Sequence, residues 1–272
     1  MNTWNARNAA RICAAAPGGK NAMMNVTTVR SPAAGAAGSA YCANRAPLLG
    51  NPLIKLPLGA VLPRGWLKHQ LDLMAEGMTG RLPEVSKFLA PDNGWFGTEK
   101  EGWEEQGYWL RGFYSLARLT GKPGLLSQAD RWIEAILGSQ DAGGYFGASF
   151  HKRVTGRNGQ VVCDLWPHMV MLDAVIRHHE ATGDRRVVPF MTRFFEFCRE
   201  LPEDQFIPAL RQDFGDWKPS IQQARAGDML PHIYWLYNRT GDEWLLPLAT
   251  RFFRRISGPS SEWLDHHVVN FT

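Results

Sequence analysis

Apolar residues recur at helical spacing through most of the chain. Two stretches, 185–200 and 243–256, show this most clearly, and in the first the apolar stripe is Val187, Met191 and Phe194. Spacing of i, i+3/i+4, i+7 predicts amphipathic helices with one face turned toward a core. Further helices are predicted over the ranges 65–77, 103–119, 165–180 and 229–239.

A short Thr-Gly turn repeats between these predicted helices. Gly121, Gly183 and Gly241 each follow a Thr, and the Thr positions are 62 and 58 residues apart. Glycine just past a helix end adopts the left-handed conformation at little cost, so each turn is expected to end one helix and begin the next. A repeated helix–turn–helix unit indicates an α-solenoid or an α/α toroid.

The fold prediction is all-α, of the (α/α)6-toroid type, but incomplete, with about four helical hairpins. The first and last hairpins are poorly defined, and the last would begin near 262–270. At this repeat length six hairpins would need more residues than the chain has, so 44–272 is expected to be a partial barrel truncated at its C-terminus. Residues 1–43 contain no acidic residue and no clear apolar core of a signal peptide, and we expect them to be disordered or targeting-like.

Long connections alternate with the short turns. They span about 139–163 and 201–227, and the first is rich in Gly and is expected to hold a small β-hairpin. A second repeat follows them: Asp164-Leu-Trp-Pro-His168 and Asp228-Met-Leu-Pro-His232 each begin a predicted inner helix. The long, Gly-rich loops and the polar helix starts should therefore meet at one rim, where a binding pocket is predicted.

The segment 102–112 carries the densest set of side chains suited to sugar binding. Trp103 and Tyr108 offer flat apolar faces, and the carboxylates of Glu104 and Glu105 are acceptors for sugar hydroxyls and weak candidates for a general acid or base. The alternatives are core packing for the aromatic residues and simple enrichment of the first helical turn in acid for the two Glu.

Four further positions are candidates for substrate contacts. Trp166 and His168 begin one inner helix, Asp228 begins the next, and His267 begins the truncated one. The alternative for His168 is a core histidine bonded to a backbone carbonyl. For Asp164 and Asp228, a helix-capping role is favoured over ligand binding.

Charge and cysteine usage exclude several classes of protein. The net charge of +4 comes from the N-terminal segment, and residues 72–272 alone are net negative, which gives no indication of nucleic-acid binding. No segment is long and apolar enough for a membrane helix. The four cysteines have no metal-ligand spacing, so no metal site is predicted in this chain, although the spacing leaves open a Cys163–Cys198 bridge. The sequence does not decide whether the protein is cytoplasmic or is exported to the periplasm or secreted.

Several motifs together resemble glycoside hydrolase family 127, the β-L-arabinofuranosidase-like proteins formerly grouped as a domain of unknown function, over residues 44–272. The motifs are Leu56-Pro-Leu-Gly-Ala-Val61-x-Pro-x-Gly-Trp66-Leu, Gly77-Met-Thr-Gly80, Trp103-Glu-x-x-x-Tyr108-Trp-Leu-x-Gly112, Asp164-Leu-Trp-Pro-His168, Ile233-Tyr-Trp-Leu-Tyr-Asn-Arg-Thr-Gly241-Asp and His267-Val-Val-Asn270.

This resemblance implies the N-terminal part of an (α/α)6 catalytic barrel and a retaining hydrolase of terminal L-arabinofuranosyl or related plant-glycan sugars. Family members use a Cys nucleophile in a zinc site of one Glu and three Cys, with another Glu as acid/base. Nothing in this chain matches those residues, so the nucleophile and acid/base are expected beyond Thr272 and the chain alone is expected to be inactive. His168 matches a sugar-contacting position and His267 resembles another. Asp228 stands where some members have a substrate-binding His, which leaves the exact sugar open.

Two other functions remain open at this stage. One is a different α/α-toroid enzyme, such as an unsaturated-uronyl hydrolase or a polysaccharide lyase, which would need no zinc. The other is a catalytically inactive remnant that binds glycans or a partner helix array. Carbohydrate is the expected partner of the enzymes and of the glycan-binding remnant.

Overall fold

The computed structural model describes residues 42–256, apart from 51–54, 57, 99 and 101. The predicted helix start at 262–270, with His267, lies outside the described residues. Within the described part, no helix is long and apolar enough to cross a membrane.

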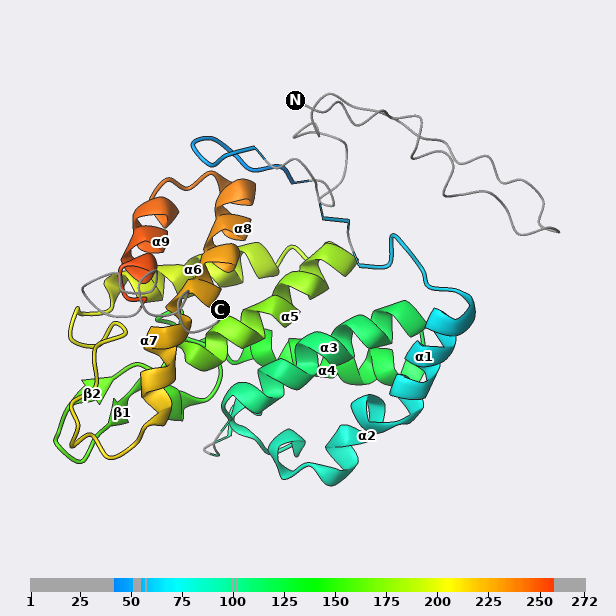
Figure 1. Ribbon diagram of the computed structural model, residues 1–272, viewed down its shortest axis with the longest axis horizontal. Coiled ribbons are helices and arrows are strands. Elements are labelled where there is room, and N and C mark those ends of the chain that lie inside the picture. Colours follow the sequence, from blue (N-terminus) through cyan, green and yellow to red (C-terminus); the bar gives the residue numbers. More distant parts are fainter. Residues whose placement is uncertain (1–41, 51–54, 57, 99, 101, 257–272) are drawn as a thin grey trace, which may run out of the picture. The chain divides into compact units, whose positions relative to one another are not determined.

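Helices account for most of the described chain (Figure 1). They are α1 (Gly65–Glu76), α2 (Met78–Val85), α3 (Glu104–Thr120), α4 (Pro123–Gly138), α5 (Trp166–Thr182), α6 (Val187–Glu200), α7 (Ile221–Arg225), α8 (Leu230–Thr240) and α9 (Leu245–Phe253). The predicted all-α fold is confirmed, with helix bounds that differ from the predicted ones by a few residues. The expected β-hairpin is also present: β1 (Val154–Thr155) pairs antiparallel with β2 (Val161–Val162).

The three predicted Thr-Gly turns join helices α3 to α4, α5 to α6 and α8 to α9. Gly121, Gly183 and Gly241 have φ angles of +65°, +71° and +78°, and each backbone N–H donates to the carbonyl oxygen four residues earlier. Only glycine adopts this left-handed conformation without strain, so the sequence repeat fixes where each hairpin turns.

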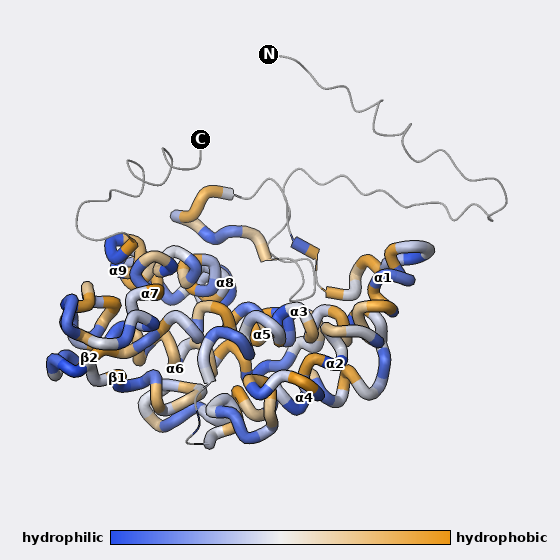
Figure 2. Tube along the Cα trace, turned by 60° about the horizontal axis from the view of Figure 1, so that its bottom comes forward, coloured by the Kyte–Doolittle hydropathy of each residue, from blue (hydrophilic) through white to orange (hydrophobic). Residues whose placement is uncertain are grey.

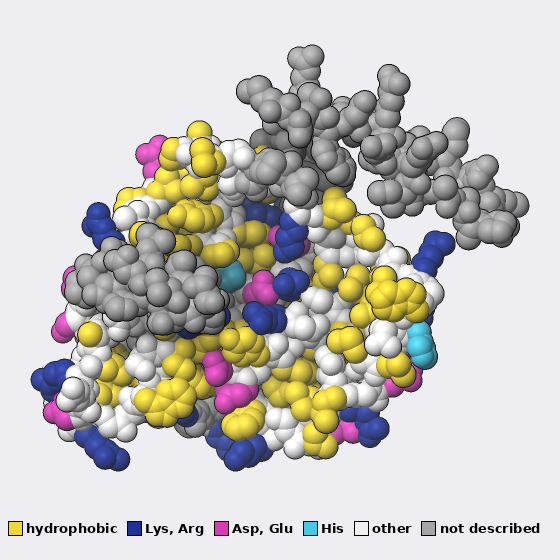
Figure 3. All heavy atoms as spheres, viewed as in Figure 1, with side chains coloured by type: hydrophobic (Ala, Val, Ile, Leu, Met, Phe, Trp, Pro, Cys, Tyr) yellow, Lys and Arg dark blue, Asp and Glu magenta, His cyan; other side chains and the backbone are white. Residues whose placement is uncertain are grey.

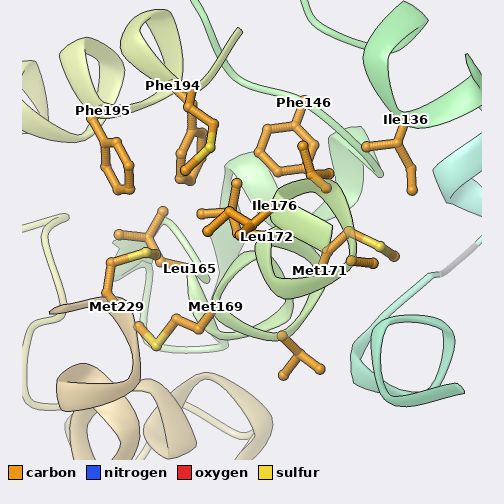
Figure 4. Packing of buried hydrophobic residues seen from close by; sticks show 14 of the residues in the cluster. Ile136, Phe146, Leu165, Met169, Met171, Leu172, Ile176, Phe194, Phe195 and Met229 are labelled. Atoms are coloured by element: carbon orange, nitrogen blue, oxygen red, sulfur yellow. The ribbon is translucent and has the colours of Figure 1, made fainter. Parts of the chain in front are cut away.

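The paired helices form an inner and an outer layer. Helix α3 packs on α5 and α5 on α8, while α4, α6 and α9 are their respective hairpin partners. Figure 2 shows α3, α5 and α8 on one side of α4 and α6. Helix α5 is buried at most of its positions, whereas α6 buries a single stripe. Figure 4 shows the core between them, where Leu172 and Ile176 of α5 face Phe194 of α6 and Phe146 of the preceding loop.

The two long loops, which were predicted to lie at one rim, pack against each other. Cys163, beside β2, pairs with Phe206 of the second loop, and the N–H of Arg157 donates to the Phe214 carbonyl at 2.8 Å. The Phe214 ring also packs directly against Gly156, because a Cβ added to this glycine would lie 2.4 Å from the ring. The loops therefore form one supported layer beside the starts of α3 and α5 rather than two independent segments.

Candidate functional site

The starts of helices α3 and α5 are joined by two tryptophan side chains. The indole Nε1 of Trp103, the residue before α3, donates to Asp164 Oδ2 at 2.9 Å. In the opposite direction, the Nε1 of Trp166, the first residue of α5, donates to Glu104 Oε2. Each carboxylate thus holds an indole from the other helix, which fixes both rings at the rim.

Asp164 is the buried centre of this arrangement. Its side chain also accepts a hydrogen bond from the Trp166 backbone N–H at 3.1 Å, and His151 Nδ1 lies 3.6 Å from Oδ2. Burial raises the pKa of Asp164 to about 7, although the two Trp donors lower it; the charges of Asp216 and Glu104 raise it further. A fully buried carboxyl cannot reach a substrate, so Asp164 acts on the site by holding the Trp103 indole and the Trp166 backbone.

In the accessible part of the cluster, the Tyr108 ring and several charged side chains surround the buried Trp166 indole. Tyr108, half-exposed on α3, lies edge-on to Trp166 with 6.2 Å between ring centroids, and the Arg111 guanidinium lies over the Tyr108 ring. Arg225 of α7 lies over Trp166 at 5.0 Å and pairs with Asp228 at 2.5 Å. Acidic and hydrophobic side chains are side by side in this region, near the start of α3 (Figure 3).

The structure therefore brings together six of the predicted site residues. They are Trp103, Glu104, Glu105, Tyr108, Trp166 and Asp228, carried by the start of α3, the start of α5 and the turn before α8. Glu105 is half-buried in the first turn of α3. Trp103 and Trp166 are buried here, which matches the alternative of core packing for these aromatic residues. The substrate-binding role of the others, and the catalytic role considered for Glu104 and Glu105, stay predictions.

His168 is placed differently. Its imidazole is buried among the rings of Trp95, Tyr145, Phe146 and Phe194, and stacks on Phe194 at 5.0 Å. Its Nε2 bonds to the Phe146 carbonyl oxygen at 2.8 Å, and burial lowers its pKa to about 3. The arrangement matches the alternative of a core histidine, and a sugar could not contact this ring in the described conformation.

Neither aspartate is the predicted N-cap of its helix: Leu165 and Met229 hold those positions in α5 and α8, and neither helix start has a side-chain cap hydrogen bond. Asp164 precedes the N-cap residue, and its Oδ1 accepts from the backbone N–H of Trp166 two residues on, as in an Asx turn. Asp228 lies within a 3-10 turn (Ala226–Met229) and its carboxylate pairs with Arg225, so α8 begins without a side-chain cap. Each aspartate lies two residues before its helix, so the two differ in their partners and not in their distance from the helix start.

Sequence reasoning missed the residues that the second long loop brings to the rim. Trp217 lies edge-on to Trp103 with ring centroids 6.1 Å apart, and the Lys218 ammonium lies 5.4 Å from the Trp103 ring centroid. Arg225 was missed as well. A Trp in a long polar loop was the available signal, but periodicity alone does not say which distant helix such a loop reaches.

The described residues do not fit the zinc site that the family resemblance implies. Among them, no group of three or more His, Cys, Asp or Glu could hold a metal ion. Cys163 and Cys198 are free and fully buried, so the bridge left open by their spacing is absent, and burial raises the pKa of both thiols well above the usual range. Neutral thiols are poor nucleophiles and poor metal ligands.

The chain belongs to the family of β-L-arabinofuranosidase GH127 catalytic domains, because the family model matches residues 78–269, more than half of the sequence. This match covers the starts of α3, α5 and α8 and both long loops, the parts that build the rim.

Two further comparisons were made. The solved structures include a similar chain, the crystal structure of a GH127 β-L-arabinofuranosidase from Geobacillus stearothermophilus T6, with 20% sequence identity and a TM-score of 0.47. The similarity covers 72% of this chain but 32% of that one, so the present chain spans about a third of the length of the solved protein. No curated protein matches the sequence.

Proposed function

We propose that this chain forms the sugar-binding rim of a glycoside hydrolase that acts on terminal L-arabinofuranosyl or related plant-glycan sugars. The observation that carries this proposal is the half-exposed Tyr108 ring and the partly exposed Glu104 carboxylate on α3, supported by the buried indoles of Trp103 and Trp166, in a chain from the GH127 catalytic-domain family. Aromatic faces bind the C–H side of a sugar ring, and carboxylates and guanidinium groups bind its hydroxyls.

The described residues supply binding and positioning rather than the bond-breaking chemistry. A retaining glycosidase needs a nucleophile and a protonated acid that both reach the anomeric centre. The carboxyl whose pKa is raised, that of Asp164, is buried, and the thiols of Cys163 and Cys198 are buried and protonated. In this proposal the retaining mechanism takes its nucleophile, its acid/base and its zinc from residues outside the described part.

The test has a catalytic arm and a binding arm. The purified 272-residue chain is assayed with p-nitrophenyl L-arabinofuranosides, and the binding of an oligosaccharide ending in L-arabinofuranose is measured by calorimetry. We expect binding without turnover, and about tenfold weaker binding for Glu104→Gln, because an uncharged acceptor makes a weaker hydrogen bond to a hydroxyl. The control is Glu196→Gln on α6, where the carboxylate lies outside the rim cluster.

The outcomes separate the alternatives. Clear turnover by the chain alone would show that its own residues complete the reaction. It would refute the proposal that the described residues bind the sugar and that other residues break the bond. If unsaturated uronides are processed instead, the chain is another α/α-toroid enzyme. If the longest natural gene product binds the sugar but never hydrolyses it, a glycan-binding remnant is the correct description.

A further inference from the structure

Trp217 is an exposed indole on an otherwise ordered turn. Its exposed fraction is 65%, whereas Trp103 and Trp166 in the same cluster are buried. Leaving most of an indole in water forgoes the free energy that its burial would contribute, which is of order 2 kcal/mol. An isolated exposed apolar side chain needs no explanation, so the argument depends on what surrounds this one.

The backbone of Trp217 is fixed by the turn that follows it. The carbonyl oxygen of Trp217 accepts hydrogen bonds from both the backbone N–H (2.9 Å) and the hydroxyl (2.5 Å) of Ser220, and Pro219 in the same short 3-10 turn is buried. The Lys218 N–H donates to Asp216 Oδ1 at 3.0 Å, which closes the turn on its other side. Because these hydrogen bonds already order the backbone of the turn, a ligand that covers the indole does not have to order it.

The indole of Trp217 is also supported from below. Its ring meets the buried Trp103 ring edge-on at an interplanar angle of 89°, and Trp103 is itself held by the hydrogen bond from its Nε1 to Asp164. The contacts from the Asp164 carboxyl to the Trp103 indole, and from there to the Trp217 indole, link the loop at 201–227 to the start of α3. One face of Trp217 is thereby oriented by the protein core instead of by solvent.

Charged residues neighbour Trp217 in the chain and surround the Trp103 and Asp164 side chains that support it. The Lys218 ammonium lies over Trp103, and the carboxylates of Asp216 and Glu104 are near enough to raise the pKa of Asp164. An exposed indole in a part of the molecule that also carries a cation and carboxylates suits a sugar ring, which is apolar on its C–H face and carries hydroxyls around its edge.

From this arrangement we infer that Trp217 is the stacking platform of a carbohydrate subsite, which binds a sugar residue of the glycan next to the one held by Glu104 and Tyr108. The inference rests on the proposed function in one respect, the class of ligand. Trp217 contributes affinity for longer oligosaccharides and little for a single sugar.

The test compares three variants of the 272-residue chain by calorimetric titration with L-arabinose and with an oligosaccharide ending in L-arabinofuranose. Trp217→Ala is expected to weaken oligosaccharide binding about tenfold, as removal of a stacking ring does elsewhere, and to leave monosaccharide binding unchanged. Trp217→Phe keeps a ring face and should retain most of the affinity. Trp66→Ala removes the 73%-exposed indole of α1 and serves as the matched control, with no expected change.

Each possible result decides the question. Equal affinity of Trp217→Ala and wild type for the oligosaccharide would overturn the platform while leaving the proposed function intact. The titration is repeated with xylohexaose and cellohexaose. If one of these glycans binds and its binding depends on Trp217, the platform is supported and the arabinofuranosyl specificity is refuted. If wild type binds none of the glycans, the inference is wrong. Thermal unfolding of each variant checks that the fold is retained.

Discussion

The two repeats that begin α5 and α8 share a sequence pattern, and their histidines do the same work. His168 Nε2 bonds to the Phe146 carbonyl oxygen and His232 Nε2 bonds to the Met169 carbonyl oxygen, both at 2.8 Å. Each histidine reaches back to the unit before it, and burial lowers the pKa of both, so each is neutral. A buried neutral imidazole with one bonded nitrogen joins two elements without the cost of burying a charge.

The aspartates of the same repeats differ completely. Asp164 follows β2, is fully buried and accepts hydrogen bonds from Trp103 and Trp166. Asp228 lies in a 3-10 turn that follows α7, and its half-exposed carboxylate pairs with Arg225. The same residue at the same motif position therefore positions the rim in one repeat and forms a surface ion pair in the other. A shared sequence motif therefore does not determine the burial or the partners of its side chains, because these depend on the segments packed around each copy.

The largest effect is expected from removing the shared histidine contact. His168→Ala should lower the free energy of unfolding by about 3 kcal/mol, because it leaves a cavity among four aromatic rings and an unpaired carbonyl. His232→Ala should cost about 2 kcal/mol, since fewer rings surround it. Urea unfolding measures both. Equal or reversed costs would show that the aromatic enclosure of His168 adds no stability.

A smaller effect, specific to one repeat, is expected from pH. Because the folded-state pKa of Asp164 is raised to about 7, above the usual 3.8, its contribution to stability is fully present below pH 3.8 and is lost as pH rises through about 7. The stability difference between wild type and Asp164→Asn should therefore change by about 2 kcal/mol between pH 5 and pH 7 in favour of the variant.

Urea unfolding at both pH values measures this difference, and other titrating groups cancel in the comparison of wild type with variant. A difference that does not change with pH would mean that Asp164 is ionised throughout, and the burial argument for its pKa would then be wrong.

The smallest effect is expected at the other aspartate. Asp228→Asn removes one exposed ion pair with Arg225 and should change the free energy of unfolding by less than about 0.5 kcal/mol at any pH. The same unfolding experiments provide the measurement. A cost above 1 kcal/mol would show that the two repeats are more alike than their surroundings indicate.

The helices and turns could be predicted because their signals are local. The stripe of Val187, Met191 and Phe194 and the left-handed turns at Gly121 and Gly183 depend on neighbours within one or two turns of the chain. The rim could be predicted in part, because inner-helix starts and long loops must lie at the same end of a repeated hairpin. Trp103, Glu104 and Trp166 accordingly lie together.

The contacts that could not be predicted join residues far apart in the sequence. Trp217 reaches Trp103 across 114 residues because the second long loop folds over the first, and no periodicity records that path. The burial of His168 likewise follows from Phe146 and Trp95, which come from two different connections.

By itself the sequence determined the secondary structure, the hairpin repeat and the family, since these follow from short-range spacing and from which residue types stand at fixed offsets. Only the tertiary structure decided which of two matching aspartates is buried and which tryptophan is left facing water. Solvent exposure and charge state depend on every chain segment packed around a side chain, and those segments arrive from distant parts of the sequence.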